Sequence, residues 1–368
     1  MFKKEVEFIK NTFNSNDDFL PLHPPVFDER EIELVTECIK STFVSSVGKF
    51  VTEFEDIVAK FCGVKKAVAC VNGTNALHLG LLLAGVKPGD KVITQPLTFI
   101  ATANAIKYCN AEPVFVDVDK DTMGLSPESL EDYLKKHKND STQKIKAVVP
   151  MHTFGHPCRI AEIKEVCSKY DVKLVEDCAE SLGSFYYGIH TGNWSEGASL
   201  SFNGNKTITT GGGGMLLFND EKLAEHAKYL TCQAKIPHKW EFRHSECGYN
   251  YRMPNINAAL GVAQMEKLPK LIASQRELAT IYEAFFADRF VKEPANAVSN
   301  YWLQAIRMED IKERNAFLEY TNSHGVMTRP VWTLMNELEM FKNCEHADLS
   351  NAKWLEERLV NIPSGARL

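Results

Sequence analysis

The chain has 368 residues, of which 44% are hydrophobic and 24% are charged, and this composition is typical of a globular protein with a large core. Its formal net charge of −6 leaves no excess of Lys and Arg to neutralise phosphates, which argues against a general nucleic-acid binder. The sequence contains no uninterrupted run of 18 apolar residues, and its charged N-terminus lacks the apolar core of a signal peptide, so we expect neither a membrane span nor a leader.

The ten cysteines are dispersed and form no CxxC pair. Most of them lie in apolar runs such as "AVACV" and "IKEVCSKY", so we interpret them as reduced, packed thiols of a cytoplasmic protein. No cluster of Cys and His has the spacing of zinc ligands, and we therefore predict no metal site.

The region from about residue 64 to 218 alternates short β-branched runs with helical patterns. Nearly continuous apolar strands separated by helices predict an α/β fold with a largely parallel sheet covered on both faces. In such a sheet the strand ends and the loops after them carry the site. The expected strands are 66–71, 90–95, 112–119, 145–152 and 172–177, and the expected helices between them are 74–85, 98–109, 126–137 and 160–170.

The pattern changes after about residue 219. Helical patterns at 257–268 and 271–290 are followed by a strand-like run at 301–308 and a helix-like run at 311–325. We therefore predict two domains: residues 1–265 form an N-terminal segment and the large domain, and residues 266–368 form a smaller α+β domain.

A single lysine, Lys206, lies in "SFNGNKTITTGGGG", residues 201–214. A Walker A loop requires a glycine where this chain has Asn205. A dinucleotide fingerprint requires glycines that open a helix, whereas Gly211–Gly214 lead into the strand-like "MLLF". Both nucleotide-loop interpretations therefore fail on spacing or context.

A carboxylate, Asp177, ends the expected strand 172–177. Its position suits an acid that faces the site crevice and, equally, an N-cap for the residues after it. A further strand signal at 197–202 leads to Lys206. An acid that keeps a pyridine nitrogen protonated, with a lysine that forms a Schiff base, is the combination that pyridoxal phosphate requires.

Pyridoxal phosphate also needs a phosphate cradle and a flat surface against its ring. Gly73, Thr74 and Asn75 open the expected helix after the first strand and offer free backbone N–H groups, although an ordinary turn capped by Asn72 or Thr74 remains the alternative. Phe99 begins the next helix, where a lone aromatic side chain is more often part of the core.

These segments together resemble the DegT/DnrJ/StrS group of sugar aminotransferases, which have the pyridoxal-phosphate fold type I. "SFNGNK" resembles the S-[FY]-x-x-x-K motif of the group, "EDCAESLG" its E-D-[AC]-A-[QE]-x-x-G, and "TFIATANAI" its T-F-x-A-[TS]. "GYNYRMPNINAALGVAQMEKL" resembles its G-x-N-[YF]-R-M segment and the helix after it. The resemblance extends over nearly the whole chain, with the motifs in order.

The resemblance implies specific roles. Lys206 is the catalytic lysine that binds the cofactor covalently, Asp177 is the partner of the pyridine nitrogen, Glu180 lies near the ring oxygen, and Phe99 stacks on the ring. The phosphate ligands are Thr74, Asn75 and Ser201, beside Gly73, together with Asn250 of a neighbouring subunit. A homodimer with composite sites is implied. Relatives that dehydrate sugars have histidine in place of the lysine, so Lys206 favours amino transfer.

Subgroup motifs such as "PLHPPVF", "SNYWL" and "TRPVWTLM" resemble the legionaminic-acid and bacillosamine pathway enzymes. This resemblance implies transfer of an amino group from glutamate to C4 of a UDP-linked 2-acetamido-2,6-dideoxy-4-hexulose, giving a 4-amino-4,6-dideoxy sugar for glycan or nonulosonic acid biosynthesis. The candidate substrate contacts are Ser46, Lys49, Arg329 and Trp332, with a packing tryptophan and a surface arginine as the alternative.

Other functions stay open at this point. The nearest alternative is a C3 aminotransferase of a dTDP- or GDP-linked 3-keto-6-deoxy sugar, and more distant ones are a non-catalytic regulator and a cysteine desulfurase. Relatives usually continue past "NIPSG" with an amphipathic helix, whereas this sequence stops at "ARL", so we expect a less stable small domain.

Overall fold

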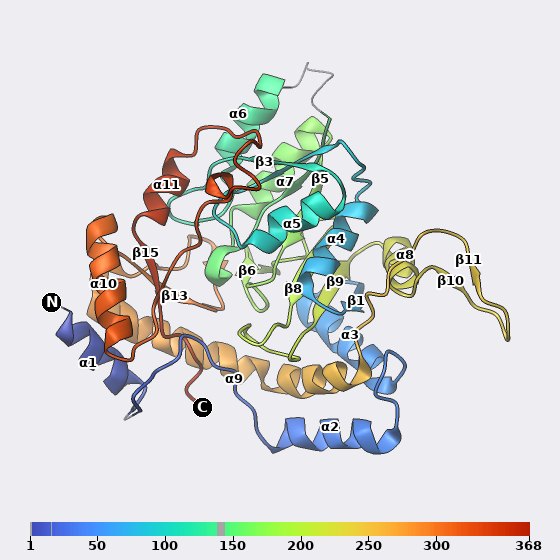
Figure 1. Ribbon diagram of the computed structural model, residues 1–368, viewed down its shortest axis with the longest axis horizontal. Helices are drawn as coiled ribbons and strands as arrows, with labels where there is room; N and C mark the ends of the chain where they lie inside the picture. The colour runs from blue at the N-terminus through green and yellow to red at the C-terminus, as the bar shows by residue number, and fades with distance from the viewer. Residues whose placement is uncertain (1, 16, 138–143) are drawn as a thin grey trace.

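The computed structural model describes residues 2–15, 17–137 and 144–368. Its centre is a seven-stranded sheet in the order β1-β9-β8-β5-β4-β2-β3 (Figure 1). The strands are β1 (Lys66–Cys70), β2 (Lys91–Thr94), β3 (Glu112–Phe115), β4 (Ile145–Val149), β5 (Lys173–Asp177), β8 (Gly197–Ser201) and β9 (Gly214–Phe218). Neighbours from β3 to β8 run parallel, and β9 runs antiparallel to both β8 and β1. The predicted α/β fold with a largely parallel sheet is confirmed.

Alternate residues of the parallel strands enter two different cores. Ile93, Val148 and Leu174 pack with α6 (Pro127–His137) and α7 (Ile160–Tyr170) on one face. Val92 and Val175 pack with α4 (Gly73–Leu83) and α5 (Ile100–Tyr108) on the other. Because successive side chains of a strand point to opposite faces, a strand between two helical layers is apolar on both, which explains the continuous apolar runs.

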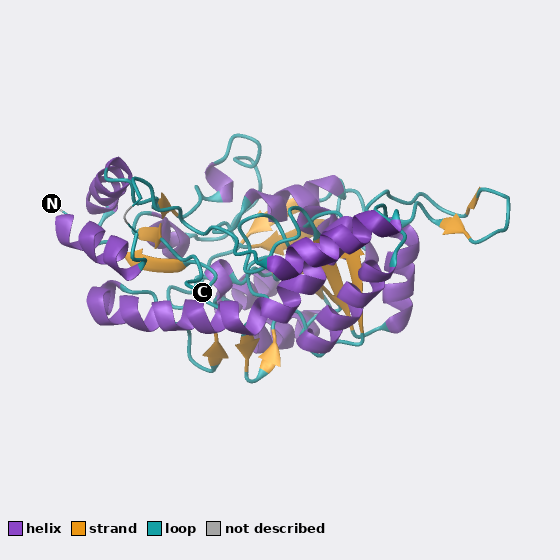
Figure 2. Cartoon of the chain, turned by 90° about the horizontal axis from the view of Figure 1, so that it is seen from below, coloured by secondary structure: helices purple, strands orange, loops and turns teal. Residues whose placement is uncertain are grey.

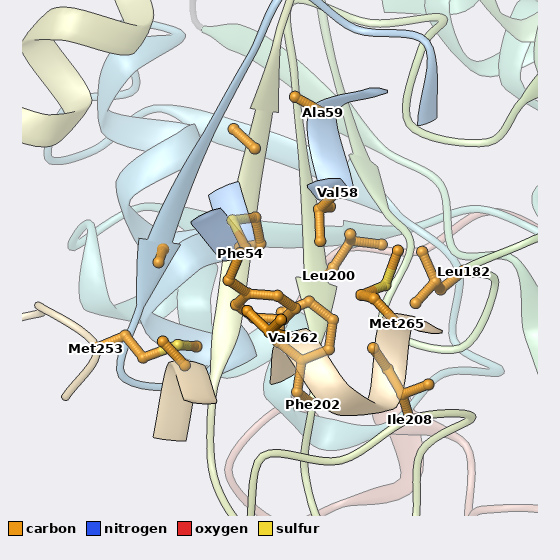
Figure 3. Close-up of a cluster of buried hydrophobic side chains, with 14 of the residues drawn as sticks. Phe54, Val58, Ala59, Leu182, Leu200, Phe202, Ile208, Met253, Val262 and Met265 are labelled. Atoms are coloured by element: carbon orange, nitrogen blue, oxygen red, sulfur yellow. The ribbon is translucent and has the colours of Figure 1, made fainter. Parts of the chain in front are cut away.

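The antiparallel end of the sheet packs against α3 (Lys49–Cys62) and α9 (Asn255–Phe286). Phe54 and Phe202 lie at the centre of this core, with ring centroids 4.9 Å apart, and Val262 of α9 packs beside them (Figure 3). The same core fixes the start of the loop that carries Lys206, because Phe202 directly follows β8.

One long helix, α9, replaces the two predicted helices 257–268 and 271–290, so the predicted break between them is wrong. Pro269 lies inside α9. Proline removes one helical hydrogen bond, but buried residues on both sides of it, including Leu268 and Leu271, hold the helix in one piece. The helix also crosses residue 266, and the division into two domains there stays a prediction.

The C-terminal region contains the antiparallel sheet β13-β15-β14, which consists of β13 (Gln304–Arg307), β15 (Leu359–Ile362) and β14 (Arg329–Pro330). It also contains α10 (Ile311–Ser323) and α11 (Ser350–Glu356). The N-terminal helix α1 (Lys3–Thr12) packs here, with Val6 and Ile9 in a core shared with Tyr282 and Phe317 (Figure 1).

A hairpin of β10 (Lys235–Ile236) and β11 (Arg243–His244) projects from the body of the molecule, beyond α8 (Glu221–Thr231) (Figure 2). Trp240 and Phe242 at its end are 74% and 81% exposed. A second exposed element is α2 (Glu29–Ser41), which packs along α9. Among the helices of the described ranges, we find none that combines the length and the apolar character of a membrane span.

Candidate active site

A cavity of about 360 Å³ opens at one edge of the central sheet, where β1, β2, β5 and β8 end. Because these four strands run in the same direction, their carboxyl ends bring distant parts of the sequence together. The cavity is lined by Asn72, Gly73, Thr74, Leu77, Phe99, Ala101, Met151, Asp177, Ala179, Glu180, Ser201, Asn203, Asn205, Lys206, Gly212, Gly213, Trp302 and Trp332.

Asp177, the last residue of β5, is 5% exposed. One carboxylate oxygen accepts a hydrogen bond from Thr102 Oγ1 at 2.8 Å, and the other accepts one from the backbone N–H of Ala179 at 3.1 Å. Burial raises the pKa of this carboxyl, while the hydrogen bond from Thr102 acts in the opposite direction. The N-cap alternative does not hold, because a turn and not a helix follows Asp177.

The Nζ of Lys206 lies 3.2 Å from Oε1 of Glu180. The lysine side chain is 13% exposed and the glutamate side chain 1%. The second oxygen of Glu180 accepts a hydrogen bond from the backbone N–H of Phe154 at 2.9 Å. Burial raises the pKa of Glu180 to about 7, although the nearby Lys206 charge lowers it. Near neutral pH this carboxyl therefore exists in both protonation states.

The N-terminus of α4 faces the same cavity. Asn72 caps the helix, with its side chain accepting from the N–H of Asn75 at 2.8 Å, so the predicted ordinary cap is present together with the open helix end. Gly73 packs against Ser201, where a Cβ at residue 73 would lie 2.8 Å from Cβ of Ser201. The positive end of the helix dipole and the Ser201 hydroxyl together form a site suited to an anion.

Aromatic side chains form one wall of the cavity. Phe99 is 50% exposed and lies next to Trp332, with ring centroids 6.4 Å apart. The ring of Phe154 also packs against Trp332, with ring centroids 5.4 Å apart. Phe99 is thus exposed enough for contact with a flat ligand, which a phenylalanine in a core would not offer.

The structure brings Gly73, Thr74, Phe99, Asp177, Glu180, Ser201, Lys206 and Trp332 to this cavity. It does not bring the remaining predicted residues there. Asn75 uses its backbone N–H inside the cap of α4. Asn250 is exposed at the base of the hairpin, and Arg329 is exposed on β14. Ser46 and Lys49 line a separate cavity of about 770 Å³, where Lys49 is paired with Glu37.

A second polar cluster lies under the site. His152, Glu176 and Cys178 are buried, and their ligand-capable atoms lie within 4.8 Å of one another. The Glu176 carboxylate already accepts hydrogen bonds from the N–H groups of Gly192 and Trp194 at 2.7 and 3.1 Å, and His152 lies 3.3 Å from it. We interpret the cluster as a hydrogen-bonded part of the core, and the absence of a metal site stays a prediction.

The profile of the DegT/DnrJ/EryC1/StrS aminotransferase family matches residues 25–368. The chain belongs to this family. A relative in Escherichia coli O157:H7, "GDP-perosamine synthase", is 37% identical over 94% of this chain and 93% of its own length. A relative in Bacillus subtilis (strain 168), "Putative pyridoxal phosphate-dependent aminotransferase EpsN", is 37% identical over 94% of this chain and 91% of its own length. The crystal structure of the aminotransferase TlmJ from Streptoalloteichus hindustanus has a TM-score of 0.87 and 29% identity, covering 95% of this chain and 94% of its own.

The chain is therefore a sugar aminotransferase of the DegT/DnrJ/EryC1/StrS family, with pyridoxal phosphate as its cofactor. The cavity has the chemical groups that this cofactor needs: a buried carboxylate, a lysine amine, an open helix N-terminus and an aromatic face. The residues present thus fit the cofactor.

Sequence reasoning missed two residues of the site. Thr102, the third residue of α5, donates a hydrogen bond that orients Asp177. Trp302 lies over Lys206 and came to attention only as part of a subgroup motif. A tryptophan at the start of an expected strand is typical of a core residue, so no sequence pattern connected it with Lys206.

Proposed function

We propose that this aminotransferase moves an amino group from glutamate to C4 of a nucleotide-linked 4-keto-6-deoxyhexose. The observation that carries the proposal is the position of Lys206 beside Glu180 and Asp177 at the carboxyl edge of the sheet. Bound pyridoxal phosphate supplies an electron sink for the carbon that loses or gains the amino group.

Each chemical need of that cofactor has a candidate in the cavity. Asp177 would hold the ring nitrogen in its protonated form, because a carboxylate stabilises a cation beside it. The backbone of Gly73 and Thr74, with the Ser201 hydroxyl, would hold the phosphate. Phe99 would stack on the ring, and Asn75 remains a candidate phosphate contact through its side chain.

Lys206 would hold the cofactor covalently, and its amine, when free, would serve as the base that moves a proton at the carbon that loses or gains the amino group. Glu180 would accept a hydrogen bond from the free amine, since its Oε1 lies within hydrogen-bond distance of Nζ. The ionised form of Glu180 favours the ammonium, and the protonated form favours the neutral amine that acts as a base. We therefore assign Glu180 to the control of the Lys206 charge.

Two nucleotide sugars are candidates for the amino acceptor. The subgroup motifs around "SNYWL" and "TRPVWTLM" favour a UDP-linked 2-acetamido sugar. The E. coli relative, named "GDP-perosamine synthase", favours a GDP-linked sugar. Trp332, in the cavity wall, and Arg329, three positions earlier, are the candidate contacts with the nucleotide sugar.

A second copy of the chain completes the site in this proposal. Ser46, Lys49 and Asn250 lie outside the cavity of their own chain. Near Ser46 the surface carries exposed apolar side chains: Ile39 at 55%, Phe43 at 58% and Val47 at 68%. Such a patch favours contact with protein, and a homodimer would bring these residues to the cavity of the partner.

All ten cysteines are unpaired, which supports a cytoplasmic location.

The test is a turnover assay with ¹⁵N-labelled glutamate and four acceptors: UDP- and GDP-linked 4-keto sugars and dTDP- and GDP-linked 3-keto sugars. We expect ¹⁵N at C4 of a 4-keto acceptor in the product NMR spectrum, and the Lys206→Ala protein should give none. Label at C3 would replace the proposal by the alternative C3 activity. Sulfide released from cysteine, without amination of any acceptor, would indicate a desulfurase.

A further inference from the structure

The indole of Trp302 lies against the amine of Lys206. The Nζ of Lys206 lies 4.0 Å from the centroid of the Trp302 ring system. The edge of the same indole binds the loop of the lysine, because Nε1 donates a hydrogen bond to the carbonyl of Asn205 at 2.6 Å. Trp302 is 3% exposed, so these contacts are formed in a desolvated environment.

The backbone of Trp302 is fixed by Asn300. The Asn300 side-chain oxygen accepts from the backbone N–H of Trp302 at 2.8 Å. Its amide nitrogen donates to the carbonyl of Glu180 at 2.9 Å and lies 3.3 Å from Oγ1 of Thr207. Asn300 thus connects Trp302 with Glu180, which is the other partner of Lys206, and with Thr207.

Gly155 leaves the space for this arrangement. A Cβ at residue 155 would lie 1.8 Å from Oδ1 of Asn300, and the φ of Gly155 is +92°. The half-buried ring of His23 lies near the indole, with ring centroids 6.3 Å apart. The tryptophan is therefore held through its backbone N–H and through the edge of its indole, while its ring face meets the lysine.

An indole face attracts an ammonium group through the ring quadrupole, and the attraction is stronger where water is excluded. Unlike a carboxylate, the indole neither gains nor loses a proton in this pH range, so its attraction stays constant while Glu180 changes charge near neutral pH. Two neighbours of different chemistry thus hold one amine.

We propose that Trp302 is a positioning residue for Lys206, whose indole face keeps the free amine in place against Glu180 whenever it is not linked to the cofactor. This inference rests on the proposed function, because the free amine of Lys206 matters only in an aminotransferase. The contacts of Trp302 with Lys206 and Asn205 lie within one chain.

The first test measures the reactivity of Lys206 in the cofactor-free, full-length chain by trace labelling with acetic anhydride and peptide mass spectrometry, with the exposed Lys3 as internal standard. Loss of the indole destabilises the ammonium and uncovers the amine, so Trp302→Leu should raise the labelling rate of Lys206 by about fivefold. Trp302→Phe, which keeps an aromatic face, should stay within about twofold of the parent.

The matched control is Trp332→Leu, which removes an indole from the same cavity wall and should leave the labelling rate of Lys206 at the parental value. Equal rates in the parent and Trp302→Leu would overturn the proposal. So would a Trp302→Phe rate equal to that of Trp302→Leu, because then the edge hydrogen bond and not the face would hold the amine.

A second measurement avoids the risk that Trp302→Leu does not fold. Biosynthetic incorporation of mono-, di- and trifluorinated tryptophan withdraws electrons from the ring with little change of shape. The labelling rate of Lys206 should rise with each fluorine in the parent and stay constant in the Trp302→Phe background; a constant rate in both would overturn the proposal. Borohydride trapping of the cofactor on Lys206 is measured separately in the parent, so failure of the proposed function is distinguishable from failure of this inference.

Discussion

Gly73, the first residue of α4, and Ser201, the last residue of β8, meet at the anion-binding end of the cavity. A Cβ at residue 73 would lie 2.8 Å from Cβ of Ser201 and 3.3 Å from the carbonyl oxygen of Leu200. This close approach brings the first turn of α4 beside the end of β8. The phosphate site of the proposal depends on that contact.

Gly73→Ala should therefore weaken cofactor binding at least tenfold, because the added methyl group displaces either Ser201 or the start of α4. The measurement is a titration of the apoprotein with pyridoxal phosphate followed by absorbance. Gly204→Ala is the control, since a Cβ at residue 204 meets nothing within 4 Å. Equal affinities of the Gly73→Ala and Gly204→Ala proteins would contradict the assigned phosphate site.

Glu180 should make the stability of the apoprotein depend on pH. Its pKa is about 7 in the folded chain against an ordinary value of 4.5. The folded state therefore keeps a proton that the unfolded state has released, and stability falls as the pH rises from about 4.5 to about 7. The fall is complete above pH 7 and amounts to something on the order of 3 kcal/mol.

Glu180→Gln keeps an acceptor for the N–H of Phe154 and removes the titration. Denaturant unfolding at several pH values should show a flatter profile for this variant than for the parent. Glu309→Gln, which changes an exposed carboxylate, should follow the parental profile. Parallel profiles for the parent and Glu180→Gln would be incompatible with a raised pKa of Glu180.

Lys267 joins α9 to α2 through a buried ion pair. Its Nζ lies 2.8 Å from Oε1 of Glu31, and the two side chains are 7% and 3% exposed. Removal of one partner leaves the other charge buried without compensation, so Lys267→Met should lower the free energy of unfolding by about 3–5 kcal/mol.

The matched control is Glu33→Gln, which removes an exposed partner of Arg30 on the same helix and should change the free energy of unfolding by less than about 1 kcal/mol. Urea unfolding followed by circular dichroism measures both. A similar small effect of both variants would mean that the buried pair does not stabilise the attachment of α2.

The proposed dimer predicts that charge on the patch near Ser46 disrupts association. Phe43 and Val47 are 58% and 68% exposed, and the double variant Phe43→Glu/Val47→Glu should sediment as a monomer in analytical ultracentrifugation. Met340→Glu, at a side chain that is 62% exposed on another part of the surface, should sediment as the parent does. A dimeric double variant would place the interface elsewhere.

The order of strands and helices from β1 to β5 was predictable because each strand is apolar on both faces and each helix between them has its own periodicity. The antiparallel placement of β9 between β1 and β8 was not, since register and direction depend on pairing partners distant in the sequence. The continuity of α9 through Pro269 likewise depends on packing and not on the local pattern.

Eight of the predicted site residues, including Asp177 and Lys206, line one cavity because motifs at strand ends converge at one edge of the sheet. The contact of Trp302 with Lys206 escaped prediction because it joins the C-terminal region to the central sheet. The roles of Asn250, Ser46 and Lys49 stay predictions, because they depend on contacts with a second copy of the chain.

The most direct test of the account is borohydride reduction of the protein saturated with pyridoxal phosphate, followed by peptide mapping. We predict one reduced adduct, on Lys206, that disappears when glutamate is added before the reduction. An adduct on another lysine, or an adduct on Lys206 that glutamate leaves unchanged, would contradict the assignment of Lys206 as the catalytic residue of an aminotransferase.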